Sequence, residues 1–251
     1  MTRPDPAVAE SAPDRQPSPV AEYYDRYWSD QQRRYLPEAT LRSLIFSGVT
    51  SQTRCLDVGC GAGNSYAPEF ARLGAPYVGV DVSAQAVQAA QAAGVDARVI
   101  GDAAELPFAA DSFDLVLCIE VLEHLFSPQR AAAEIQRVLR PGGRLVASAP
   151  NVAYWRLRAN MLFGVWNPIG DELSLQQPWR DPHIRFFTPQ TLARMLSMAG
   201  FATVDTGTHN GRLLDHLTSR PSSFGQSRAY GYLERRFPSL LGMTIHAVAT
   251  K

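Results

Sequence analysis

The sequence predicts an α/β protein with a seven-stranded, mostly parallel sheet, helices on both faces and a small cap insertion. From Thr53 onward, short apolar runs alternate with segments of helical periodicity, and this alternation is typical of a parallel sheet. Of the 251 residues, 45% are hydrophobic, which is enough for the core of one such domain. We expect a domain over residues 21–251, with a cap over 151–187.

The first 20 residues are rich in Pro, Ala, Ser and Asp and contain no cluster of large apolar side chains. Such a segment buries too little apolar surface to offset the entropy of ordering, so residues 1–20 are predicted to be a disordered tail. The aromatic-rich stretch 21–28 follows, and its rings either cover part of a pocket or pack a leading helix onto the domain. A second amphipathic helix is expected to end near Phe46.

Five short apolar runs are the predicted parallel strands, and two later runs close the sheet. They are residues 55–58, 77–80, 97–100, 115–119 and 144–148, followed by 201–206 and 244–250. Ser83, Ser127 and Thr188 are predicted helix N-caps. The segment 151–187 interrupts the expected link from strand to helix and is predicted to cap a substrate pocket, whereas 207–243 stays largely unassigned.

Composition limits the binding partners and the cellular environment that we expect for the protein. Charged residues make up 19% of the chain and the formal net charge is zero, so we expect no extended nucleic-acid surface. Cys55, Cys60 and Cys118 fit neither a zinc ribbon nor a disulfide framework, and their odd number favours reduced thiols in the cytoplasm. No stretch has the length and hydrophobicity of a transmembrane helix, so we expect no membrane insertion. The expected oligomeric state is a monomer or homodimer.

A glycine-rich loop, Asp-Val-Gly-Cys-Gly-Ala-Gly over residues 57–63, follows the first predicted strand. Gly59 and Gly61 permit a tight turn and a close approach of the backbone to a ligand, and Gly63 lets helix and strand pack closely. Dehydrogenases normally have a different spacing, Gly-x-Gly-x-x-Gly, although the loop alone does not exclude another class of nucleotide-binding protein. Asp57 either contacts a cofactor amino group through water or organises the loop backbone.

Further motifs stand beside the next strands. Asp81 ends the second strand, where a carboxylate accepts hydrogen bonds from both ribose hydroxyls, and Asp102 follows the third strand, where it is placed to accept from an adenine amino group. Ser-Phe-Asp at 112–114 precedes the fourth strand, and Leu-Arg-Pro-Gly-Gly at 139–143 precedes the fifth. In order and spacing, these motifs resemble the class I S-adenosylmethionine (SAM)-dependent methyltransferases over roughly residues 50–205.

The resemblance implies a Rossmann-like fold that binds SAM and transfers its methyl group to a small-molecule acceptor. The residues implied to bind the cofactor lie in the loop and at the strand ends: Asp57, Gly59, Gly61, Gly63, Asp81, Val82, Asp102, Ala103 and Glu120. Two alternatives stay open, a non-catalytic SAM-binding partner or sensor and a nucleotide-linked dehydrogenase. The intact carboxylates of the crevice disfavour the non-catalytic alternative.

The fourth strand leads into Glu-Val-Leu-Glu-His at 120–124. If the chain turns helical there, Glu120, Glu123 and His124 share one face and point into the crevice at the carboxyl ends of the strands. Two carboxylates and an imidazole suit a divalent metal, and His183 of the cap is a fourth candidate ligand. Asn151 is expected to reach the pocket. The remaining histidines, His209, His216 and His246, show no partner set.

Glu-x-x-Glu-His followed distantly by His is similar to two methyltransferase groups, the ubiquinone-biosynthesis O-methyltransferases and the small-RNA 3′-terminal ribose methyltransferases. The resemblance implies that Glu120, Glu123, His124 and His183 hold Mg²⁺ or another divalent ion that chelates two adjacent acceptor oxygens. Glu123 or His124 then takes the proton of the acceptor hydroxyl.

Three interpretations of the 120–124 cluster stay open: a metal site, a metal-free base, and a structural role in which Glu120 holds the methionyl part of SAM. The predicted reaction is O-methylation of a hydroxyl of the catechol or sugar-diol type. Metal-free N- or C-methylation is the alternative.

Overall fold

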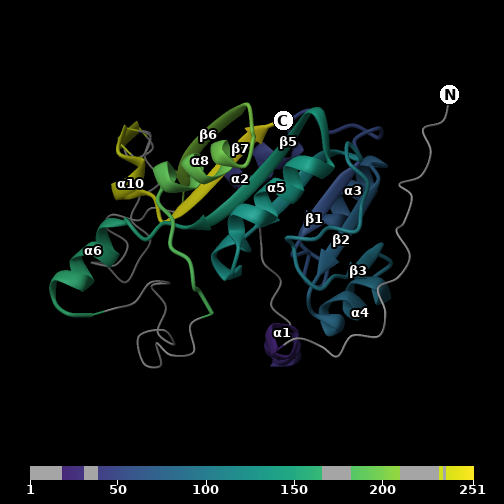
Figure 1. The fold of residues 1–251 in the computed structure, drawn as a ribbon, viewed down its shortest axis with the longest axis horizontal. Coiled ribbons are helices and arrows are strands. Elements are labelled where there is room, and N and C mark those ends of the chain that lie inside the picture. Colours follow the sequence, from purple (N-terminus) through teal and green to yellow (C-terminus); the bar gives the residue numbers. More distant parts are fainter. Residues whose placement is uncertain (1–18, 31–38, 166–181, 210–231, 234–235) are drawn as a thin grey trace.

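The computed structural model describes residues 19–30, 39–165, 182–209, 232–233 and 236–251. Seven strands form one sheet: β1 (Cys55–Val58), β2 (Tyr77–Asp81), β3 (Ala97–Val99), β4 (Phe113–Ile119), β5 (Leu139–Pro150), β6 (Thr203–His209) and β7 (Thr244–Thr250). Their order is β3-β2-β1-β4-β5-β7-β6. Strands β1 to β5 are parallel, and β7 is antiparallel to both of its neighbours. The predicted mostly parallel, Rossmann-like α/β sheet is therefore confirmed (Figure 1).

Helices cover both faces of the sheet. The described helices are α1 (Pro19–Asp30), α2 (Ala39–Phe46), α3 (Ala67–Leu73), α4 (Ala84–Ala92), the 3₁₀ helix η1 (Leu122–His124), α5 (Pro128–Val138), α6 (Trp155–Leu162), α8 (Pro189–Met198) and α10 (Pro238–Leu241). In β4, Val116 and Cys118 pack towards α5 and α8, whereas Leu115 and Leu117 pack towards α2 and α3. Successive strand residues point to opposite faces, so the apolar run 115–119 of this strand is buried from both sides.

Two of the three predicted N-caps form capping hydrogen bonds. Ser83 Oγ accepts from the backbone N–H of Ala86 at 3.1 Å, and Thr188 forms a reciprocal capping box with Thr191. Ser127 precedes α5 as predicted but makes no capping hydrogen bond. Its ψ of 67° lies far from the extended values of 118° at Ser83 and 163° at Thr188, so its hydroxyl is not aligned with the first turn.

Strand β5 starts earlier than predicted. Leu139 pairs with Phe113 and Arg144 pairs with Leu115, so five residues of β5 advance against two of β4. The Pro-Gly-Gly motif at 141–143 therefore lies inside the strand as a bulged segment, in which Gly142 has a φ of 74°. The motif was predicted to precede the strand because proline and glycine ordinarily end an element.

Several expectations fall on parts of the chain outside the described residues. These parts are 1–18 of the predicted tail, 166–181 of the predicted cap, and 210–231 and 234–235 of the unassigned stretch. The two ends of the cap segment do meet, because Asn151 forms a bridge with Phe187 and Val152 N–H donates to Phe187 O at 3.1 Å. The domain boundaries 1–20, 21–251 and 151–187 stay predictions.

The three cysteines are buried and form no disulfide in the structure. Among the described residues, no helix has both the length and the apolar character needed to cross a membrane.

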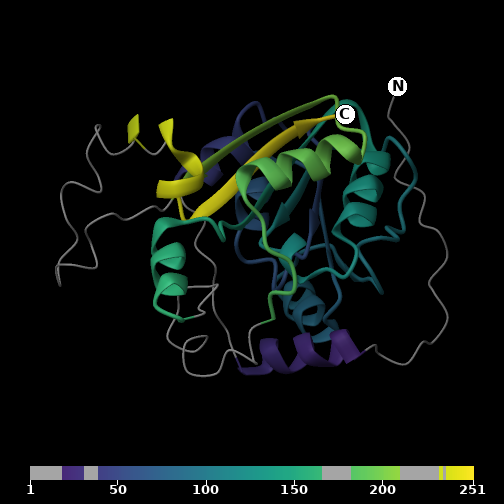
Figure 2. The same ribbon diagram turned by 60° about the vertical axis from the view of Figure 1, so that its left-hand side comes forward.

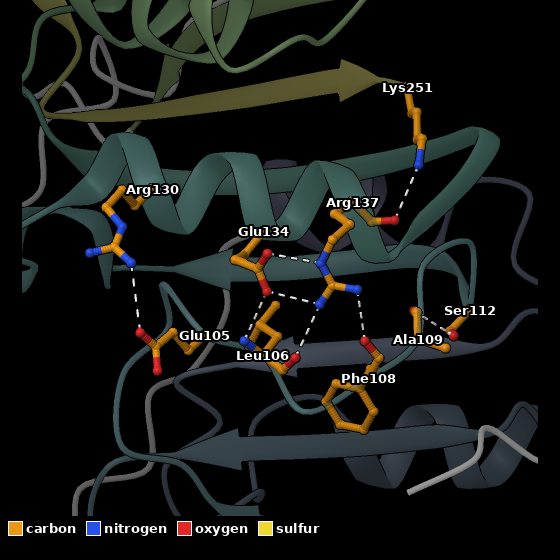
Figure 3. A network of polar contacts seen from close by, with 9 residues as sticks. All are labelled: Glu105, Leu106, Phe108, Ala109, Ser112, Arg130, Glu134, Arg137 and Lys251. Atoms are coloured by element: carbon orange, nitrogen blue, oxygen red, sulfur yellow. Dashed lines mark hydrogen bonds and ion pairs between the residues drawn. The ribbon is translucent and has the colours of Figure 1, made fainter. Parts of the chain in front are cut away.

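Helix α5 holds the loop that follows β3 through a network of polar contacts (Figure 3). Glu134 accepts a hydrogen bond from Leu106 N–H at 3.0 Å, and Arg137 donates to Leu106 O at 3.1 Å and to Phe108 O at 2.8 Å. Glu134 and Arg137 also pair with each other at 2.8 Å. This loop contains Asp102, so the network fixes a segment that is predicted from the sequence to bind the cofactor.

Replacing Arg137 by Met should lower the free energy of unfolding by about 1–2 kcal/mol, because two backbone carbonyls lose a charged donor. Urea denaturation followed by circular dichroism measures this. Arg130→Met is the matched control on the same helix: Arg130 is 67% exposed and its ion pair with Glu105 is 3.6 Å long, so this pair contributes little. Equal losses in the two variants would contradict the role given to Arg137.

Candidate functional site

The glycine loop between β1 and α3 approaches its neighbours too closely for side chains. Gly59 has a φ of 78°, and a Cβ there would lie 2.3 Å from Val121 Cγ2. At Gly63, with a φ of 68°, a Cβ would meet Val95 and Ala90 at 3.1 to 3.3 Å. The first glycine therefore lets β1 turn beneath the segment after β4, and the last lets α4 and its following turn pack against the loop.

Asp81 joins this loop to the end of β2. Its Oδ2 accepts from Gly61 N–H at 2.9 Å, and its Oδ1 accepts from Ser83 N–H at 2.9 Å. Burial raises the pKa of Asp81, whereas hydrogen bonds from the backbone of Ser83, Gly61 and Val82 oppose that rise. The carboxylate is thus held in one orientation by the backbone around it.

Asp57 is buried within β1, next to the loop. Tyr77 Oη donates to its Oδ2 at 2.6 Å. Burial raises the pKa of Asp57 from 3.8 to about 7, while the Tyr77 hydrogen bond lowers it and the charge of Asp81 raises it further. A carboxyl group in this state is readily ionised by a nearby cation.

The loop after β3 places Asp102 and Ala103 differently. Asp102 is exposed, and its Oδ1 accepts from Ala104 N–H at 2.9 Å, which leaves the second oxygen turned to the surroundings. Ala103 is buried in the core cluster between the sheet and α5. Only the backbone of Ala103 is therefore placed to line a cofactor site.

Glu120, Glu123 and His124 do not share a helical face, so that prediction is wrong. Glu120 has a φ of 55°, in the left-handed region, and the helix that follows is the short η1. The sheet causes this turn: Glu120 N–H still donates to Ser148 O at 3.2 Å, and Glu120 Oε1 accepts from Ser148 Oγ at 2.6 Å. Burial raises the pKa of Glu120 to about 7, and the Ser148 hydrogen bond opposes that rise.

The structure brings Glu123, His124 and His183 together. Glu123 Oε1 lies 3.8 Å from Nε2 of His124 and 3.8 Å from Nε2 of His183, and the ligand atoms of the three residues lie within 4.8 Å of one another. Backbone N–H groups of Ile184 and Arg185 donate to Glu123 O at 3.0 Å, which fixes the segment that carries His183. Glu120 does not belong to this group.

The carboxyl group of Glu123 has no hydrogen-bonding partner among the described residues. Both carboxylate oxygens are buried, and the side chain is 1% exposed. Burial and the nearby charge of Glu120 raise the pKa of Glu123 well above its ordinary value. A buried carboxyl group without hydrogen bonds is costly, and its retention beside two imidazoles fits a site for a cation that would replace its proton.

His124 has the protonation state that a metal ligand needs. Burial, and then the neighbouring His183, lower the pKa of His124 to about 4, so its ring is neutral near pH 7. Its Nδ1 lies 3.3 Å from Pro182 O, and since a carbonyl only accepts, Nδ1 carries the proton. The lone pair on Nε2 therefore faces Glu123. Metal-binding histidines commonly donate their other nitrogen to a carbonyl in this way. The residues present fit a divalent metal.

Some expectations about other polar residues are wrong. Asn151 does not reach a pocket, because its amide nitrogen donates to Gly242 O at 2.7 Å and its side-chain oxygen accepts from Ala153 N–H. His209 and His246 do have a partner, since their Nδ1 atoms lie 3.1 Å apart. The contacts of Asn151 with Gly242 and of His209 with His246 join residues far apart in the sequence, so no local sequence pattern predicts them.

Sequence reasoning missed two residues beside the cluster. Ser148 is the one polar residue in the apolar run 145–149 of β5, and this interruption was a usable signal. Tyr24 lies edge-on to His124, with ring centroids 5.8 Å apart, and its aromatic neighbours gave no way to single it out.

The chain matches a family model for a methyltransferase domain over residues 56–147. It is 27% identical to a ubiquinone biosynthesis O-methyltransferase of Cupriavidus pinatubonensis, over 82% of this chain and 87% of that protein. It is 32% identical to the protein of the same name from Hahella chejuensis, over 68% of this chain and 74% of that one. A crystal structure of a possible histamine N-methyltransferase from Thermotoga maritima has a TM-score of 0.63 at 19% identity, over 92% of this chain and 99% of that one.

The sheet order and the glycine loop define a methyltransferase domain with a Rossmann-like fold. Given the extent of its similarity to the curated relatives, the chain belongs to the class I SAM-dependent methyltransferases. SAM is thus its methyl donor, and the predicted family and enzyme class are confirmed. The names of these relatives include both an oxygen and a nitrogen acceptor, so the similarity establishes the donor and leaves the acceptor to be argued from the site.

Replacing Asp57 by Asn should remove part of the pH dependence of the free energy of unfolding. The folded-state pKa of about 7 lies above the ordinary 3.8, so the folded wild type binds the extra proton and its stability falls as the pH rises through 7. Between pH 5.5 and pH 8 this amounts to about 2 kcal/mol, which the variant should not lose. Denaturant unfolding of both proteins without SAM at the two pH values measures the difference. Parallel pH curves would contradict the assignment.

Proposed function

We propose that the protein methylates a hydroxyl oxygen of a small molecule with two adjacent oxygens, of the catechol or sugar-diol type. We further propose that Glu123, His124 and His183 hold Mg²⁺ or another divalent ion for this reaction. The observation that carries the proposal is the buried Glu123 carboxyl group, which has no hydrogen bond in the described structure and whose Oε1 lies 3.8 Å from each of two imidazole Nε2 atoms.

In this proposal SAM lies over the loop of Gly59, Gly61 and Gly63. The carboxylate of Asp81 accepts hydrogen bonds from the ribose hydroxyls, and Asp102 accepts one from the adenine amino group. The backbone of Val82 and Ala103 lines the adenosine. The remaining cofactor contacts are to the methionyl part: Asp57 faces its ammonium group through water, and Glu120, held by Ser148, lies on the side of the acceptor.

The reaction needs alignment and the loss of one proton. The acceptor oxygen attacks the methyl carbon, the carbon–sulfur bond breaks, and the sulfonium becomes a neutral thioether. When bound, a divalent ion lowers the pKa of an acceptor hydroxyl. Glu123, His124 and His183 orient the two acceptor oxygens and exclude water. Without a metal, the proton goes to Nε2 of His124, since its Nδ1 donates to Pro182 O.

A hydroxyl acceptor explains the cluster better than an amine does. A neutral amine attacks with its lone pair and loses its proton afterwards, so it needs no buried base or metal beside it. A hydroxyl is a weak nucleophile until its proton is removed. The curated relatives named above are O-methyltransferases, which also supports oxygen as the acceptor.

Methyl transfer from radiolabelled SAM to a panel of catechols, sugar diols and amines tests the proposal. Each acceptor is assayed after EDTA treatment and again with Mg²⁺, Mn²⁺ or Zn²⁺ restored. We expect methylation of vicinal oxygens that falls at least about tenfold with EDTA and returns with metal. Full activity on diols in EDTA would favour His124 as a metal-free base, and transfer to amines alone would overturn the proposal.

Replacing Glu123 by Gln should separate metal binding from stability. Without metal, the variant should melt close to the wild type, because the raised pKa of Glu123 keeps the buried acid protonated and the amide is its neutral isostere. With a saturating divalent ion, only the wild type should gain stability. Differential scanning fluorimetry in EDTA and in metal measures both effects. Glu105→Gln, at a side chain 72% exposed, is the matched control. Equal metal-induced shifts in Glu123→Gln and the wild type would remove Glu123 from the metal site.

A further inference from the structure

Helix α1 contacts both the proposed cofactor side of the candidate site, at Ser83, and the proposed acceptor side, at His124, through two consecutive residues. Asp25 Oδ1 accepts a hydrogen bond from Ser83 Oγ at 2.6 Å and from Gln85 N–H at 3.2 Å, at the start of α4. The next side chain back, Tyr24, lies edge-on to His124. Figures 1 and 2 show α1 beneath the sheet, next to α4 and away from the helices that cover the two faces.

These contacts place α1 across the carboxyl end of β1. Ser83 follows β2 and His124 follows β4, and both of these strands pair directly with β1. Neighbouring strands lie about 4.8 Å apart, so the axes of β2 and β4 are separated by about 10 Å. Two adjacent residues of one helix can contact both sides only if that helix crosses the space between them. That space is the carboxyl end of β1, where the glycine loop begins.

We infer that α1 is a cofactor lid: Asp25 closes it onto the start of α4, and closure brings Tyr24 against His124 in the acceptor site. The inference depends on the placement of SAM over the glycine loop proposed above. With SAM in that position, α1 covers it, so α1 must open for the cofactor to enter and for S-adenosylhomocysteine to leave. Asp25 and Tyr24 are then positioning residues, one for the lid and one for His124.

The charges around Ser83 couple the lid to the cofactor. Ser83 donates from its backbone to Asp81 and from its hydroxyl to Asp25, so two carboxylates flank one residue. The charge of Asp25 is one of the causes that raise the pKa of Asp81. Ribose hydroxyls that donate to Asp81 would offset this repulsion, and closure of α1 should therefore be more favourable when SAM is bound. By linkage, the closed lid strengthens SAM binding by the same factor.

The Asp25 contact has the strength that a lid requires. A carboxylate at a helix N-terminus is stabilised by the first-turn N–H groups and by the helix dipole. Asp25 is partly exposed, so water competes for these hydrogen bonds and the contact opens reversibly.

Hydrogen exchange of the full chain, with and without saturating S-adenosylhomocysteine, tests closure directly. We expect the α1 amides to exchange at least about tenfold more slowly in the complex, because opening becomes rarer. If calorimetry shows binding but the α1 amides exchange at the same rate, the lid is overturned while the cofactor site stands. If the ligand does not bind at all, both the lid and the cofactor placement fail.

Replacing Asp25 by Ala should make S-adenosylhomocysteine dissociate about tenfold faster in stopped-flow displacement. Alanine favours helix more than aspartate, so a faster release does not arise from a weakened α1. Asp25→Asn keeps one acceptor oxygen and should give an intermediate rate. Glu22→Ala, at an exposed acid of the same helix, is the matched control and should dissociate like the wild type. Equal rates for Asp25→Ala and Glu22→Ala would refute the role of Asp25.

Discussion

The carboxylate of Asp81 is the interaction on which the candidate site depends. It accepts from Gly61 in the glycine loop and from Ser83 at the start of α4, so one side chain sets the distance between these elements. Through the hydroxyl of Ser83 the same contact extends to α1. A buried acid with its backbone donors already in place needs little reorganisation to accept further hydrogen bonds, which supports the proposal that the end of β2 binds a ribose.

A second constraint, a buried acid without hydrogen bonds, governs the proposed acceptor side. Glu123 is buried without a hydrogen bond in the part of the chain that the structure describes, and Glu120 adds like charge nearby. His124 is neutral and directs its Nε2 lone pair towards Glu123. Such an arrangement lowers the stability of the fold, and proteins tolerate such costs mainly at functional sites. A divalent cation or an acceptor proton would relieve the cost, which links the instability of the site to its chemistry.

The two halves of the site lie on opposite sides of β1, and α1 spans them. The polar network of Glu134 and Arg137 holds the Asp102 loop to α5 from outside, while the paired cap ends at Asn151 and Phe187 hold the segment of His183. The site is therefore built from loops, and each loop is fixed to a rigid element by charged or amide side chains. In the proposed function, the sheet on which all of these loops end aligns donor and acceptor.

The sequence by itself determined the fold and predicted the residues that we propose to bind the cofactor. Apolar strands buried on both faces, the caps at Ser83 and Thr188 and the sterically required Gly59 are local features, and local features can be read along the chain. Only the tertiary structure decided which residues lie together on the proposed acceptor side. There the sheet forced Glu120 into a left-handed turn away from Glu123, and distant segments brought His183 and Tyr24 to His124. Contacts of this kind depend on how separate loops converge in space, and no periodicity in the sequence encodes that convergence.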